Sequence, residues 1–82
     1  MTDHLATAPR RLQYGIKPKP LLAKSLRKLE AARKSLRGIA ALWGDIDGTV
    51  EFAVDMEALP ALDELEQALR EAVEYLNEPP GT

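Results

Sequence analysis

The chain has 82 residues, no cysteine and a formal net charge of −2. These totals favour one small domain, and they exclude a disulfide framework and a thiolate zinc site. No apolar stretch approaches the roughly 20 residues that span a bilayer, and the N-terminal residues lack the basic start and apolar segment of a signal peptide. We therefore expect a cytoplasmic protein without membrane contact.

The small net charge conceals an asymmetry between the two halves of the chain. Residues 1–44 contain ten Lys or Arg and two acidic residues, which gives a net charge of +8. Residues 45–82 contain eleven acidic residues and one Arg, which gives −10. Such an asymmetry indicates charged partners, and the whole-chain totals do not reveal it.

The first half of the chain predicts an arm, a short strand and a long helix. Residues 1–9 are polar and are expected to form a disordered arm. Residues 11–16 alternate apolar and polar, which is compatible with a strand. Pro18 and Pro20 end any strand, and Pro20 suits the first position of a helix. Apolar residues then recur at helical spacing over 21–43, and Leu22, Leu29 and Leu36 mark every seventh position. Gly44 is a natural end for this helix.

The second half predicts a turn, a strand and a second helix. Residues 45–48 contain turn-forming residues, and Val50, Phe52 and Val54 would share one face of a strand over 49–55. The apolar pattern of residues 57–76 then has helical spacing. Residues 79–82 are expected to form a C-terminal tail.

We therefore predict a mainly α fold with a minor β element, in one domain over residues 10–78. Two amphipathic helices of similar length favour a two-helix hairpin, with a basic first helix and an acidic second helix. Arg33 and Glu66 flank the seam and are placed to pair across it. The strand over 49–55 needs a partner, which is either residues 11–16 in a small β-α-β-α unit or the same strand of a second copy. Val50, Phe52 and Val54 are the candidate residues of that homodimer interface.

Residues 45–49, Asp-Ile-Asp-Gly-Thr, resemble the nucleophile motif of haloacid-dehalogenase-type phosphatases. The resemblance would make Asp45 the nucleophile and Asp47 the acid/base. The family motif ends a buried strand of a large doubly wound sheet and requires a downstream lysine. Here the motif follows a leucine-patterned helix, and the last lysine is Lys34. The resemblance therefore does not extend to the activity.

The same stretch also resembles part of a calcium-binding loop. With Gly48 at the sixth loop position, the first and twelfth positions fall on Trp43 and Val54, and neither provides a carboxylate. We interpret residues 45–48 as a turn. The only histidine is His4, so a Ser-His triad is also disfavoured. We expect no catalytic, cofactor or metal site, and hence a protein that is not an enzyme.

The helices predict binding functions instead. The first hypothesis is a protein-interaction or assembly module, whose candidate partner-binding residues are Leu62, Leu65, Leu69, Glu64 and Glu71. The alternative is a nucleic-acid-binding regulator, whose candidate residues are Lys24, Arg27, Lys28, Lys34 and Arg37. That layout resembles small bacterial antitoxins in organisation, with a basic DNA-binding part followed by an acidic toxin-binding part. A third interpretation is that the charges only keep two helices in solution.

Overall fold

The computed structural model describes residues 8–80, and within this range every regular element is helical. The elements are α2 (Arg10–Tyr14), α3 (Pro18–Trp43), α4 (Gly48–Ala53), the π-helix η1 (Val54–Ala58) and α5 (Leu59–Asn77). The mainly helical class predicted from the sequence is confirmed. Residues 1–7 of the predicted arm and residues 81–82 of the predicted tail lie outside the described residues.

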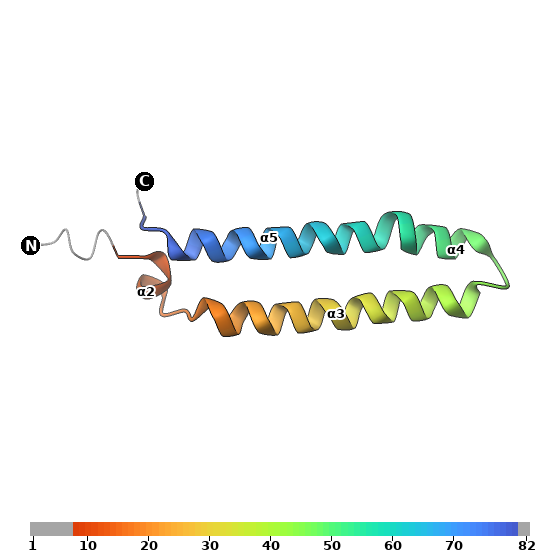
Figure 1. Cartoon of the computed structure of the whole chain (residues 1–82), viewed down its shortest axis with the longest axis horizontal. Coiled ribbons are helices and arrows are strands. Elements are labelled where there is room, and N and C mark those ends of the chain that lie inside the picture. Colours follow the sequence, from red (N-terminus) through yellow and green to blue (C-terminus); the bar gives the residue numbers. More distant parts are fainter. Residues whose placement is uncertain (1–7, 81–82) are drawn as a thin grey trace, which may run out of the picture.

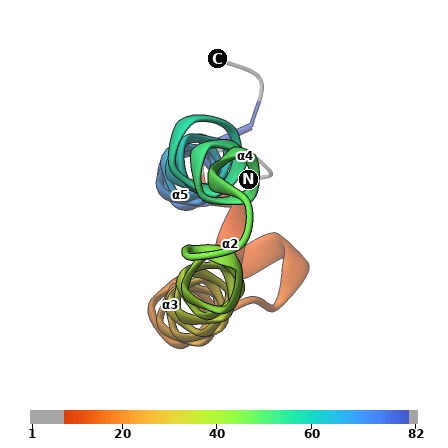
Figure 2. The ribbon, with the colours of Figure 1, turned by 90° about the vertical axis from the view of Figure 1, so that its right-hand side faces the viewer.

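The long helices form a single layer. The elements α4, η1 and α5 follow one another without a break and run antiparallel to α3, to which a short turn connects them (Figure 1). Viewed end on, the two helical stretches lie side by side with no third helix of comparable length stacked on them (Figure 2). The shortest extent of the chain is 11 Å, about the diameter of one helix with its side chains. We call this arrangement the two-helix layer.

The predicted strand over residues 49–55 is wrong, because this segment forms α4 and the beginning of η1. The Asp47 side chain accepts hydrogen bonds from the backbone N–H and the hydroxyl of Thr49, at 2.9 and 2.6 Å, and so caps the start of a helix. Val50 and Val54 are four residues apart, so a helix places both toward α3, and Val54 is only 5% exposed. Packing against α3 therefore overrides the β-propensity of these residues.

The possible strand over residues 11–16 is also wrong, because residues 10–14 form the short helix α2. Gly15 ends this helix in the left-handed region, at φ 67°. The N–H of Ile16 then donates to the carbonyl of Arg11 at 2.9 Å, which satisfies a carbonyl at the helix end. A glycine in this position closes a helix at low cost because it has no Cβ.

The two predicted long helices are present, with somewhat different ends. Helix α3 begins at Pro18 rather than residue 21, since a proline in the first turn lacks only an N–H that has no intrahelical partner. Helix α5 begins at Leu59 rather than residue 57 and follows η1 directly. Pro60 has no N–H to donate to the carbonyl four residues earlier, which is consistent with the wider π turn that precedes it.

The layer has a seam rather than an enclosed core. Among the described residues, only Leu29 and Val54 are buried apolar side chains, at 4% and 5% exposure. The other seam residues are half-buried on the facing sides of the two helices: Leu22, Leu26, Leu36 and Ala40 on α3, and Leu62, Leu69, Val73 and Leu76 on α5. Each helix therefore covers one side of its neighbour and leaves its flanks open.

Candidate interaction surfaces

Ion pairs cross the seam at the middle of the layer. The Arg33 guanidinium on α3 donates to Asp63 and Glu66 on α5, at 2.9 Å each, and lies 3.8 Å from Glu30. Arg70 donates to the other carboxylate oxygen of Glu66 at 2.9 and 3.1 Å. The predicted pairing of Arg33 with Glu66 is confirmed. Because these bonds join specific positions on two helices, they fix how far one helix is displaced along the other.

These hydrogen bonds, from Arg33 first and Arg70 second, lower the pKa of the Glu66 carboxyl below its ordinary value of 4.5. The unfolded chain therefore binds this proton more tightly than the folded protein does. The stabilisation is fully present above about pH 4.5 and is lost as the pH falls through the lower folded pKa.

We expect the thermal unfolding midpoint to decrease as the pH is lowered from about 5 to about 3, and to decrease less in Glu66→Gln. Circular dichroism melts of the two proteins across this range measure the difference. The carboxyl of Asp47, whose pKa the Thr49 hydroxyl and N–H lower, keeps its part of the dependence in both proteins. Equal slopes for the wild type and Glu66→Gln would contradict the prediction.

The candidate nucleic-acid residues line the outer part of α3. Lys24, Arg27, Lys28, Lys34 and Arg37 are all exposed, and none of them forms an ion pair with another described residue. At about 100° per residue, Lys24, Arg27 and Lys34 point away from the seam. The structure therefore brings these three together as a basic edge of the layer.

The candidate partner-binding residues on α5 divide into two groups. Leu62 and Leu69 are half-buried in the seam with α3, so they are not free for a partner while the layer is intact. Leu65 lies beside the seam and is 48% exposed. Glu64 and Glu71 are exposed on the outer part of α5, where Gln67 donates to Glu71 at 3.1 Å. Only Leu65 and the two acids are accessible.

The candidate homodimer residues do not share a face. Val54 is buried against α3 and Val50 is half-buried, whereas Phe52 is 61% exposed. In a helix, residues two apart point in nearly opposite directions, so Phe52 lies on the outer side of α4. The assignment of all three to one interface assumed a strand, and in the helix only Phe52 of the three remains exposed.

An exposed apolar cluster at the turn was missed by the sequence reasoning. We call it the turn-end patch; it comprises Ile39, Leu42, Trp43, Ile46, Phe52 and Met56, all of them exposed. Leu42 and Ile46 are 75% and 72% exposed. A signal was present in the sequence, because neither residue fits the heptad positions of the seam. Ile39, Leu42 and Trp43 lie on the last turns of α3, and Phe52 and Met56 lie on the outer side of the stretch formed by α4 and η1. Exposed apolar side chains gathered at one end of a molecule are typical of interaction sites.

Arg10 fixes α2 to the end of α5. Its backbone N–H donates to the carbonyl of Glu78 at 3.0 Å, and its guanidinium donates to the carbonyl of Tyr75 at 3.1 Å. The guanidinium also lies 3.9 Å from the centre of the Tyr75 ring and 3.9 Å from the Glu78 carboxylate. A cation at a helix C-terminus is favourable because the last carbonyls carry partial negative charge.

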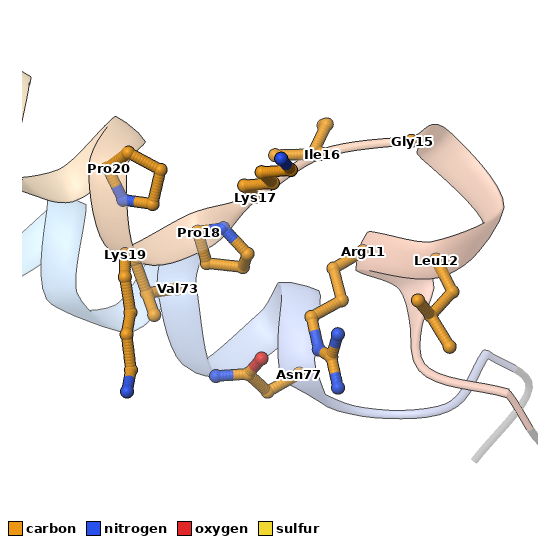
Figure 3. A pocket seen from close by; sticks show the side chains of 10 residues that line it. All are labelled: Arg11, Leu12, Gly15, Ile16, Lys17, Pro18, Lys19, Pro20, Val73 and Asn77. Carbon is orange, nitrogen blue, oxygen red and sulfur yellow. The ribbon is translucent and has the colours of Figure 1, made fainter.

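This attachment creates a cleft of about 740 Å³ at the end of the layer opposite the turn, which we call the open end (Figure 3). Its walls come from α2, the segment that connects α2 to α3, and the last turns of α5. The lining residues are Arg11, Leu12, Gly15, Ile16, Lys17, Pro18, Lys19, Pro20, Val73 and Asn77. Three of them are cations and none is acidic, so the lining of the cleft is partly apolar and positively charged.

The turn itself has a structural role. Asp47 caps α4, and Asp45 is exposed. Within residues 8–80, no three acidic or histidine side chains gather closely enough to hold a metal ion. No helix of the described chain is long and apolar enough to cross a bilayer.

The chain matches no protein-family model, no curated protein and no solved structure.

Proposed function

We propose that the protein is a non-enzymatic interaction or assembly module, which binds other protein surfaces through apolar side chains that its own fold leaves open. One observation carries this proposal. Among residues 8–80, two apolar side chains are buried and eleven large apolar side chains are exposed, and six of the exposed ones form the turn-end patch. Leaving so much apolar surface in water is unfavourable, and burying it against a partner recovers about 25 cal/mol per Å².

The charges of the layer add specificity to this contact. The outer part of α3 carries exposed cations, and the outer part of α5 carries exposed acids such as Glu64 and Glu71. Charged groups around an apolar contact steer association and exclude partners of the wrong sign. The module therefore presents two edges of opposite charge on either side of an apolar surface.

Photo-crosslinking from the turn-end patch tests the proposal. A photoreactive phenylalanine analogue replaces Phe52, which is 61% exposed, and cells that produce the protein are irradiated. The matched control carries the same analogue at Gln67, an exposed polar position on α5. We expect defined protein adducts from position 52 that Met56→Asp abolishes, since Met56 is 62% exposed and lies four residues from Phe52 on the same side of the helical stretch. Adduct yields from position 52 no higher than from position 67 would overturn the proposal.

A second candidate function is a nucleic-acid-binding regulator of antitoxin-like organisation. The observation that favours it is the basic edge of α3, whose cations form no ion pair within the described chain. In this case α3 would contact phosphates, and the acidic α5 would bind a protein.

If this second function holds, neutralising Lys24, Arg27 and Lys34 together with Gln should weaken binding to labelled duplex DNA or RNA by about tenfold or more. The slope of the logarithm of the binding constant against the logarithm of salt concentration should also decrease by about two to three. Arg70→Gln, which removes a cation of α5, is the control and should change binding little. An absence of binding to either nucleic acid at low salt would exclude this function.

A further inference from the structure

The two flanks of the layer differ in chemistry. Rotating about 100° per residue from Leu29 on α3 and from Leu69 on α5 assigns each residue to a side of the seam. Because the helices face each other and run antiparallel, the same sense of rotation leads to the same side of the layer on both. On one side, which we call the polar face, lie Lys19, Glu30, Arg37, Asp63, Arg70 and Asn77. The ion pairs from Arg33 to Glu30 and Asp63 agree with this assignment.

The opposite side, which we call the apolar face, is apolar close to the seam apart from Ser25, whose hydroxyl donates to the carbonyl of Leu21. Its nearest charged residue, Lys28, lies at its outer margin. Its residues are Leu21, Ala32, Ile39 and Trp43 from α3, and Ala61, Leu65, Ala68 and Ala72 from α5. Leu21, Ile39, Trp43 and Leu65 are between 43% and 48% exposed. The small alanines make most of the α5 half flat.

Helix α2 covers the polar face and leaves the apolar face open. The cleft that α2 forms includes Lys19 and Asn77, both of which belong to the polar face. In the end-on view α2 projects to one side of the two-helix layer (Figure 2). Among the elements of the described chain, none lies over the apolar face.

We propose that the apolar face binds the apolar face of a second copy, and that the two layers form an antiparallel four-helix bundle. This inference rests on the proposed assembly function and names its first partner. Four-helix bundles bury such faces in the same manner, with helices about 8–10 Å apart. The turn-end patch remains partly open in the dimer, since Phe52 and Met56 point to the outer side of the helical stretch that contains them.

The size of the face is adequate for a stable dimer. Helix α3 has 26 residues, which corresponds to about 39 Å, and two adjacent helices are about 18 Å wide. The contact would thus cover about 700 Å² on each copy, or about 1,400 Å² in total. Specific protein interfaces bury about 1,200–2,000 Å² in total.

Charge selects one of two symmetric arrangements. A two-fold axis parallel to the helices places α3 of one copy over α5 of the other, whereas a perpendicular two-fold axis places α3 over α3. The first arrangement brings a basic edge beside an acidic edge, and the second brings like charges together. Opposite charges across the contact favour the parallel axis.

The ion pairs within one copy show which residues of the two helices lie at the same height along the layer. Arg33 lies at the height of Asp63 and Glu66. Because the helices are antiparallel, residues earlier than Arg33 on α3 lie at the height of residues later than Glu66 on α5. A parallel axis preserves these levels between copies. Glu71 of the second copy then lies within a turn of both Lys24 and Lys28.

Large and small apolar residues also match in this arrangement. At the same levels, Leu65 of one copy meets Ala32 of the other, and Ile39 meets Ala61. The alternation of large and small side chains allows the two faces to interlock as core layers do.

Sedimentation equilibrium of the full chain tests the dimer. We expect twice the mass of one chain for the wild type, and a dissociation constant raised at least about tenfold in Leu65→Glu. Gln67→Glu is the control: it adds the same charge at an exposed position on the outer part of α5 and should leave the mass unchanged. Far-ultraviolet circular dichroism checks that both variants stay helical. A monomeric wild type, or equal effects of the two variants, would overturn the proposal.

Crosslinking of single cysteines tests the axis, since the chain has no cysteine of its own. With the parallel axis, the turns of both copies lie at one end, so Asp45→Cys crosslinks to itself through a reagent of about 10 Å. With the perpendicular axis the turns are about 40 Å apart, and Asp45→Cys crosslinks instead to Lys17→Cys in a mixture. Self-crosslinking at position 45 supports the proposal, and a mixed product alone overturns it. A monomer that still forms adducts from position 52 would leave the proposed function standing without this dimer.

Discussion

Replacing Leu29 with Ala is expected to lower the free energy of unfolding by about 3 kcal/mol, the largest effect of any single truncation in α3. Leu29 is 4% exposed at the centre of the seam, where it is the only buried apolar side chain of this helix. A chain of 82 residues has a total stability of about 4–12 kcal/mol. The substitution therefore removes a large part of what holds the layer together.

The matched control is Leu42→Ala in the same helix. Leu42 is 75% exposed, so its truncation removes little buried area and should change the unfolding free energy by less than about 0.5 kcal/mol. Urea unfolding followed by circular dichroism measures both variants. In a thermal melt of a domain of this size, a loss of about 3 kcal/mol lowers the midpoint temperature by more than about 10 °C. Equal losses in the two variants would show that the seam does not lie on the face of α3 that contains Leu29.

The pattern of leucines was sufficient to locate the two long helices. The heptad spacing of Leu22, Leu29 and Leu36 places them on one side of α3, and these residues do face α5. The start of α3 was less accurate, because Pro20 was expected at its first position and Pro18 before it. Both prolines lie in the first turn, where their missing N–H groups need no partner.

The sequence misled where one pattern fits two structures. Val50, Phe52 and Val54 alternate as in a strand, but Val50 and Val54 also have the i, i+4 spacing of a helix. The Asp47 cap and the packing of Val54 against α3 select the helix, and the second of these is a tertiary effect. The helix consequently separates Phe52 from Val50 and Val54, which a strand would place on one face.

The candidate surfaces were only partly visible in the sequence. The charge asymmetry predicted basic and acidic outer parts, and the structure places them on α3 and α5. The sequence could not show that the layer has one polar and one apolar face, because that depends on which helix flanks meet across an antiparallel seam. The ion pairs of Arg33 with Glu30 and Asp63 supply this information.

Replacing Val54 with Asp should destabilise the protein by at least about 3 kcal/mol, whereas Phe52→Asp should cost less than about 1 kcal/mol. Val54 is 5% exposed in η1, so the new carboxylate would enter the seam without a partner. Phe52 is 61% exposed, and Asp at that position remains in water. The two sites are two residues apart and receive the same charge, so the difference between them reports only which way each side chain points.

This comparison also distinguishes a helix from a strand over residues 49–55. In a strand, positions 52 and 54 would share a face, and both substitutions would place a carboxylate in the same environment. In a helix they point in nearly opposite directions, and only Val54→Asp disrupts the contact with α3. Thermal melts of the two variants decide the question.

Loss of the contact between Val54 and α3 is expected to release the turn end of the layer first, because α4 and η1 lead directly into α5. The open end should unfold later, since Arg10 holds α2 to Tyr75 and Glu78 there. Amide hydrogen exchange of Val54→Asp should then show faster exchange in residues 48–58 than in residues 69–77.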